Sequence, residues 1–166
     1  MFNWLQPSIV NSHCLDCFAG SGVLGFEALS RGADAAVFIE QNVKTVKNLK
    51  QNAVVLGTSN VSVYHADTLS WLRSVAKDKH LNRHLEKQFD LVFLDPPFHS
   101  ELLAESAAIL NSSGCLAEDA IIYVEHAVDE IVALPENWYC LKNKRTGQVV
   151  YQLFEYRATG TTMPEN

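Results

Sequence analysis

The residues with the clearest chemical potential are Asp95-Pro96-Pro97-Phe98, which directly follow an apolar run. An exocyclic amine of a nucleic-acid base is a poor nucleophile, because its lone pair is delocalised into the ring. The Asp95 carboxylate and the Pro96 carbonyl can accept its N–H groups and turn that lone pair toward a methyl sulfonium. Two prolines fix the loop, and Phe98 offers a face for base stacking. The motif favours methylation of a base amine over the alternative, a rigid turn at a strand end.

A glycine-rich turn follows an earlier apolar run, in the order Asp16-Cys17-Phe18-Ala19-Gly20-Ser21-Gly22. Glycines at a strand-to-helix turn let the backbone approach a ligand closely, and the helix N-terminus offers N–H donors. Because Gly20-x-Gly22-x-x-Gly25 is also the dinucleotide fingerprint, this turn alone does not separate NAD from S-adenosylmethionine. A carboxylate at Asp16 suits a cationic amino-acid moiety and opposes a pyrophosphate. This charge favours S-adenosylmethionine.

Two further carboxylates follow the next two predicted strands. Glu40 ends the first, where it can accept hydrogen bonds from both ribose hydroxyls. Asp67 follows the second, where it can accept from an adenine amine, although it can equally cap the next helix. In a parallel sheet, ligands bind beyond the carboxyl ends of the strands. Asp16, Glu40 and Asp67, at three successive strand ends, therefore predict one cofactor site.

The elements that must position these residues alternate between strands and helices. Strands are predicted over 13–18, 35–40, 61–65, 89–94 and 120–125, and helices over 22–31, 43–56, from about 68, and 100–110. A closing hairpin is predicted over 138–144 and 148–156, turned at Arg145-Thr146-Gly147. The alternation implies an α/β fold with a parallel sheet covered by helices on both faces, and the hairpin adds an antiparallel edge.

The composition bounds the class of protein. The 166 residues, 48% hydrophobic and 19% charged, suit one folded domain over 1–166. Within it we expect residues 1–7 to end an N-terminal helix and residues 157–166 to form a flexible tail. No apolar run is long enough to span a bilayer, and the first residues lack the features of a signal peptide. The expected location is the cytosol, with no membrane partner.

Charge and cysteines qualify this interpretation. The net charge of −6 argues weakly against nucleic acid. Local basic clusters nevertheless occur at Lys44, Lys47 and Lys50, at Arg73, Lys77, Lys79, Arg83 and Lys87, and at Lys142, Lys144 and Arg145. Among the four cysteines (Cys14, Cys17, Cys115 and Cys140), Cys14 and Cys17 form a C-x-x-C without a second pair of ligands, so we predict reduced core cysteines rather than a metal site.

Taken together, these motifs resemble the Rossmann-like class I methyltransferases, and more narrowly the small-subunit (16S) ribosomal RNA guanine-N2 methyltransferases of the RsmD type. The resemblance runs over essentially the whole chain and includes Phe38-Ile39-Glu40 and Tyr123-Val124-Glu125. It implies a mostly parallel seven-stranded sheet and a monomer that binds S-adenosylmethionine and releases S-adenosylhomocysteine.

The resemblance also assigns roles to individual residues. Asp16 and the loop through Phe18, Ala19, Gly20, Ser21 and Gly22 would hold the methionine part, Glu40 the ribose, and Asp67 the adenine. Asp95, Pro96, Pro97 and Phe98 would hold the target guanine. The implied partner is small-subunit ribosomal RNA as an assembled particle.

The chain departs from the family pattern at its N-terminus, and three alternatives to the ribosomal RNA methyltransferase function remain. Family members carry a basic N-terminal segment leading into a helix that ends like Phe2-Asn3-Trp4-Leu5, whereas Met1 falls inside that helix here, so we expect a shortened N-terminus. A DNA adenine-N6 or cytosine-N4 methyltransferase would use the same chemistry but usually needs a target-recognition region. A nucleotide- or NAD-binding module would leave Asp95-Pro96-Pro97-Phe98 without a role. A shortened chain could also keep the fold without catalysis.

Overall fold

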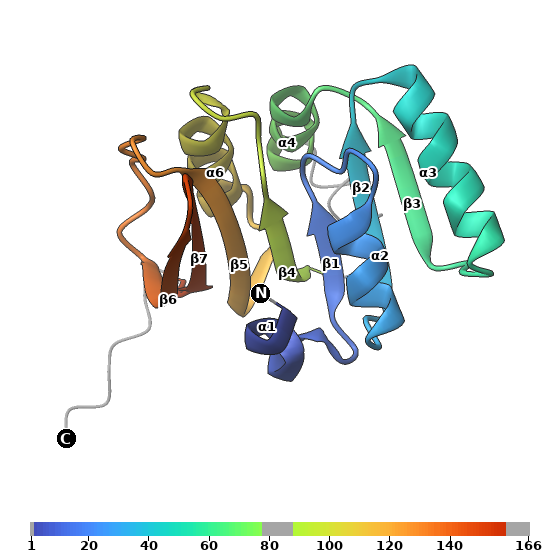
Figure 1. The fold of residues 1–166 in the computed structure, drawn as a ribbon, viewed down its shortest axis with the longest axis horizontal. Helices are drawn as coiled ribbons and strands as arrows, with labels where there is room; N and C mark the ends of the chain where they lie inside the picture. Colours follow the sequence, from blue (N-terminus) through green and yellow to red (C-terminus); the bar gives the residue numbers. More distant parts are fainter. Residues whose placement is uncertain (1, 78–87, 159–166) are drawn as a thin grey trace.

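A computed structural model describes residues 2–77 and 88–158, and in that part of the chain seven strands form one sheet (Figure 1). The strands are β1 (His13–Asp16), β2 (Ala35–Glu40), β3 (Val61–His65), β4 (Phe89–Leu94), β5 (Leu116–Ala127), β6 (Trp138–Thr146) and β7 (Val149–Tyr156). Their order is β3-β2-β1-β4-β5-β7-β6. The first five strands pair in parallel, while β7 is antiparallel to both β5 and β6. The predicted parallel sheet with an antiparallel hairpin is confirmed.

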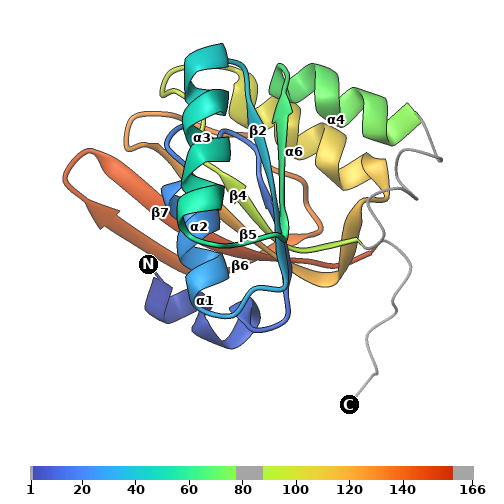
Figure 2. The same cartoon turned by 90° about the vertical axis from the view of Figure 1, so that its right-hand side faces the viewer.

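Helices cover both faces of this sheet, as Figure 2 shows. They are α1 (Phe2–Ile9), α2 (Val23–Ser30), α3 (Val43–Val55), α4 (Thr68–Lys77) and α6 (Leu102–Ser113). One core cluster joins α1, α2 and α3 to the sheet, and a second joins α4 and α6 to the opposite face. Because both faces are covered, β4 is buried along nearly its whole length, as expected of a central parallel strand. No helix in the described residues is long and apolar enough to cross a membrane.

The predicted strands 35–40, 61–65 and 89–94 have the observed bounds, but other boundaries were wrong. The first strand ends at Asp16, because the loop already turns at Cys17 and Phe18. The fifth strand is much longer than 120–125, because its first residue pairs with Phe89 and its last with Val149. These pairings are long-range and leave no local signal.

Two more predicted elements are shifted along the chain. The helix predicted over 100–110 spans Leu102–Ser113 and ends at Gly114, whose φ of 72° suits a helix C-terminus. The hairpin turn lies at Gly147-Gln148 rather than at 145–147, since β6 continues to Thr146 and pairs there with Val149.

The cysteines do not form the pair that their spacing suggests. Cys14 lies in the core cluster under α1–α3, whereas Cys17 lies in the cluster under α4 and α6. All four cysteines are free, and Cys14, Cys17 and Cys115 are buried. Cys140 is exposed on the edge strand β6.

Candidate functional site

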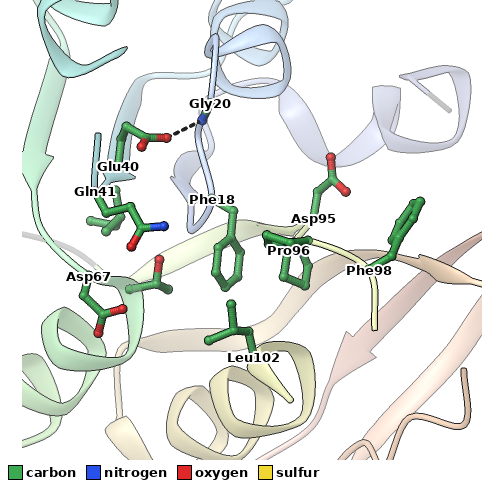
Figure 3. A pocket seen from close by; sticks show the side chains of 12 residues that line it. Phe18, Gly20, Glu40, Gln41, Asp67, Asp95, Pro96, Phe98 and Leu102 are labelled. Carbon is green, nitrogen blue, oxygen red and sulfur yellow. Dashed lines mark hydrogen bonds between the residues drawn. The ribbon is translucent and has the colours of Figure 1, made fainter. Parts of the chain in front are cut away.

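A cavity of about 420 Å³ opens beyond the carboxyl ends of β1, β2 and β4 (Figure 3). Its lining combines residues from four separate parts of the chain: Phe18, Gly20, Ile39, Glu40, Gln41, Asp67, Thr68, Asp95, Pro96, Pro97, Phe98 and Leu102. Its volume is typical of small-molecule sites, which span roughly 300–1,000 Å³. The structure thus brings together most of the residues singled out in the sequence. Asp16, Ala19, Ser21 and Gly22 do not line the cavity.

The glycine loop is held between two strands by backbone hydrogen bonds. The Cys17 N–H donates to the Phe93 carbonyl at 3.1 Å, and the Ala19 N–H donates to the Ile39 carbonyl at 3.0 Å. Gly22 begins α2 with a φ of 83°, a conformation that favours glycine. Ala19 and Gly22 are buried beneath the loop and Ser21 is exposed beside it. These three residues shape the loop rather than the cavity wall.

Glu40 links the loop to the following helix. Its Oε2 accepts a hydrogen bond from the Gly20 N–H at 3.0 Å, and its Oε1 accepts one from the Asn42 N–H at 2.6 Å. Each carboxylate oxygen has further lone pairs, so the side chain can still accept from a ligand. Two backbone donors therefore fix an acceptor at the cavity wall.

Asp67 caps a helix and also lines the cavity. Its Oδ1 accepts from the Ser70 N–H at 2.9 Å, which caps the N-terminus of α4, and the residue also lines the cavity. The neighbouring Thr68 is buried and donates from its hydroxyl to the Cys17 carbonyl at 2.5 Å. This bond ties the start of α4 to the glycine loop, so the two sides of the cavity support each other.

Asp16 lies beneath the site rather than on its surface. Only 2% of the residue is exposed, and its Oδ2 accepts from the Gly25 N–H at 3.3 Å. Burial, with a further contribution from the nearby charges of Asp95 and Glu40, raises the pKa of Asp16 to about 7. Burial likewise raises the pKa of Asp95. The carboxyl groups of Asp16, Glu40 and Asp95 thus lie close enough to interact, and their ionised forms would favour a cationic ligand.

The loop after β4 presents two side chains on one side. In Figure 3, Asp95 and Phe98 both project away from Leu102 and Phe18. The loop is anchored at its far end, where the His99 N–H donates to Glu130 Oε1, while Glu130 Oε2 accepts from the Ala127 N–H at 2.7 Å. Glu130 therefore joins this loop to the end of β5. Phe98 is 43% exposed, so its ring is available for stacking.

Comparison with known proteins identifies the family. The family described as "Conserved hypothetical protein 95" matches residues 1–155. Ribosomal RNA small subunit methyltransferase D of Haemophilus influenzae is 42% identical over 157 residues, covering 93% of this chain and 77% of that protein. The protein of the same name from Escherichia coli K12 is 40% identical over 161 residues, covering 96% and 76%. The chain belongs to the ribosomal RNA small subunit methyltransferase D family.

Solved structures agree with this membership. The yhhF protein of Escherichia coli superposes with a TM-score of 0.86 at 40% identity, covering 95% of this chain and 83% of that one. SMU.776, whose structure holds S-adenosylhomocysteine, has a TM-score of 0.70 at 12% identity over 92% and 47% of the two chains, which shows the fold alone. The predicted Rossmann-like methyltransferase fold is confirmed.

Four residues line the cavity but were not predicted as site residues from the sequence: Ile39, Gln41, Thr68 and Leu102. Three of them adjoin Glu40 or Asp67, so adjacency to a predicted ligand was an available signal. Leu102 had none, because it enters the cavity from the start of α6 by tertiary packing alone.

The structure places the predicted basic clusters in different environments. Arg73 pairs with Glu105 at 3.0 Å, so its charge is partly neutralised. Lys79, Arg83 and Lys87 lie outside the described residues. Lys142, Lys144 and Arg145 are exposed along the edge strand β6. This last cluster lies in the same hairpin that borders the end of β5.

Proposed function

We propose that the chain transfers a methyl group from S-adenosylmethionine to the exocyclic N2 amine of a guanine in small-subunit (16S) ribosomal RNA. The observation that carries this proposal is the meeting of two acceptor sets in one cavity. Glu40 and Asp67 line one side, and Asp95 and Pro96 line the other. The first set suits a nucleoside with free hydroxyls and an amine, and the second suits a base amine.

The residues fit S-adenosylmethionine, which when bound supplies an activated methyl sulfonium. We assign the glycine loop, with Asp16 beneath it, to the methionine part, Glu40 to the ribose hydroxyls and Asp67 to the adenine amine. The apolar side chains of Phe18, Ile39 and Leu102 would enclose the adenine ring. The family name and the S-adenosylhomocysteine held by SMU.776 support this choice of cofactor.

At the base, the Asp95 carboxylate and the Pro96 carbonyl would each accept one N–H of the target amine. The nitrogen lone pair then forms the new bond to the methyl carbon while the carbon–sulfur bond breaks. The amine holds one proton too many after transfer, and Asp95 would accept it. Its raised pKa suits this role, because a more basic carboxylate accepts a proton more readily.

The substrate assignment rests on the names of relatives that span this chain almost entirely. We propose an assembled small-subunit particle as the partner, a monomeric enzyme and a cytoplasmic location. The exposed basic residues of β6 would contribute to RNA binding despite the net charge of −6.

The test is transfer of labelled methyl from S-adenosylmethionine to small subunits that lack the modification, with duplex DNA in parallel. We expect label in 16S RNA, recovered as N2-methylguanine. Label in DNA alone would favour an adenine-N6 or cytosine-N4 methyltransferase instead. Binding of S-adenosylhomocysteine without transfer to either substrate would contradict the proposed reaction, and preference for NADH would contradict the cofactor.

A further inference from the structure

A second cavity, of about 260 Å³, lies at the same end of the sheet and has no role in the reaction as described so far. It is lined by Trp4, Tyr123, Glu125, Lys144, Thr146 and Tyr151. Its volume falls below the roughly 300–1,000 Å³ of sites for whole drug-sized ligands. A cavity of this size suits a planar ring system better than a complete cofactor.

Strand register connects this cavity to Asp95. Phe93 on β4 pairs in parallel with Tyr123 on β5. The last pair of this ladder joins Leu94 to Val124, so Asp95 follows β4 next to Glu125 on β5, and the charge of Asp95 acts on Glu125. Glu125 pairs in turn with Tyr151 on β7, and Tyr151 pairs with Lys144 on β6. A continuous row therefore runs from Asp95 through Glu125 to the edge strand.

The acceptor in this row is Glu125. Tyr123 donates its hydroxyl hydrogen to Glu125 Oε1 at 2.6 Å, which orients the carboxylate. Within residues 2–77 and 88–158, no donor reaches Glu125 Oε2. Burial raises the pKa of Glu125, with a further contribution from the charge of Asp95, against the lowering effect of the Tyr123 hydrogen bond. The half-buried aromatic rings of Trp4 and Tyr151 border this acceptor.

We propose that this second cavity receives the target guanine and that Glu125 selects it by accepting its N1–H. This inference rests on the proposed function. Guanine presents N1–H and the N2 amine as adjacent donors on one edge, which matches Glu125 beside Asp95. Adenine presents an acceptor at N1 and cytosine at N3, and either would face the carboxylate with lone pair against lone pair. Trp4 and Tyr151 supply rings against which the base can stack.

The test uses 2-aminopurine, which keeps the exocyclic amine but has an acceptor in place of the N1–H. Once the methylated guanine is located, small subunits are assembled from 16S RNA with guanine or 2-aminopurine at that position. We expect the wild-type protein to favour guanine in kcat/KM by roughly 10- to 100-fold, since a hydrogen bond to a charged group is replaced by repulsion. Glu125→Gln should lower this ratio about tenfold, because a carboxamide can donate to the acceptor.

Glu118→Gln is the matched control, because it removes the same charge from the exposed, opposite end of β5. It should leave the guanine to 2-aminopurine ratio unchanged. If Glu125→Gln is inactive on both RNAs, its affinities for the guanine and the 2-aminopurine subunits are measured in the presence of S-adenosylhomocysteine. The ratio of these two affinities is then compared with that of the wild type, in place of the ratio of kcat/KM values. An equal ratio in wild type and Glu125→Gln would overturn the inference while leaving the proposed function intact. Absence of transfer to guanine by the wild type would overturn the proposed function, and the inference with it.

Discussion

At the scale of single residues, a substitution of Asp95 should separate catalysis from cofactor binding. Its carboxylate projects away from Phe18 and Leu102, toward the side where we place the base. We expect Asp95→Ala to lower kcat by about 100- to 1,000-fold, the usual loss when one group that stabilises a transition state is removed. Affinity for S-adenosylhomocysteine, measured by calorimetry, should change only a few-fold. An equal loss of both would contradict the assignment.

Glu40 should show the opposite pattern. Glu40→Gln replaces one oxygen, which accepts from either the Gly20 or the Asn42 N–H, by an amide group that cannot accept, so the proposed ribose site loses a fixed acceptor. We expect the dissociation constant of S-adenosylhomocysteine to rise at least about tenfold, as for loss of a hydrogen bond to a charged group. The rate at saturating cofactor should stay close to that of the wild type. Unchanged affinity would remove Glu40 from the cofactor site.

At the scale of elements, the contact between α2 and β2 depends on Gly25. A Cβ atom at this position would lie 2.4 Å from Cε1 of Phe38, a ring that is fully buried. Gly25→Ala gains up to about 1 kcal/mol in helix propensity, but overpacking a rigid core typically costs about 1–3 kcal/mol. Because the Phe38 ring is fully buried, we expect net destabilisation in urea unfolding.

Phe38→Leu provides the control for this contact. It removes the ring that the new methyl group would strike, so the double variant should be less destabilised than the sum of the two single variants. Additive effects would show that the cost of Gly25→Ala does not arise from contact between the new Cβ and the Phe38 ring.

At the scale of the whole molecule, the gathering of carboxylates at one sheet edge should make stability depend on pH. The folded-state pKa of Asp16, about 7, exceeds the unfolded value of 3.8. Between these values the folded protein holds the extra proton, so rising pH removes stability, and the loss is complete above about pH 7. At about 1.4 kcal/mol for each pKa unit, the contribution is at most about 4 kcal/mol.

Asp16→Asn tests this electrostatic cost. In the absence of ligand, the variant should lose less stability than the wild type between pH 5 and pH 8 in urea unfolding. Wild-type preference for cationic S-adenosylmethionine over S-adenosylhomocysteine should increase over the same range, because Asp16 becomes charged. The variant should lack that increase, and a parallel pH dependence in both proteins would exclude Asp16 as its source.

The sequence alone was sufficient to predict those features that depend only on residues adjacent in the chain. The apolar run 89–94 predicted a buried strand, because burial on two faces is a local property, and Asp95-Pro96-Pro97-Phe98 after it predicted residues that line the cavity. The acidic residues Glu40 and Asp67 were found for the same reason, since each directly follows a strand whose pattern is clear. The family resemblance combined these local signals.

Tertiary structure decided what depends on strands pairing across the sheet. Three features depend on contacts between separate elements or between residues about 30 positions apart. They are the length of β5, the position of Leu102 in the cavity wall and the hydrogen bond from His99 to Glu130. Tertiary structure also placed Asp16 beneath the site instead of at its surface, and set Glu125 beside Asp95 in one row. Side-chain periodicity shows which residues face a core, but strand register determines which of them meet.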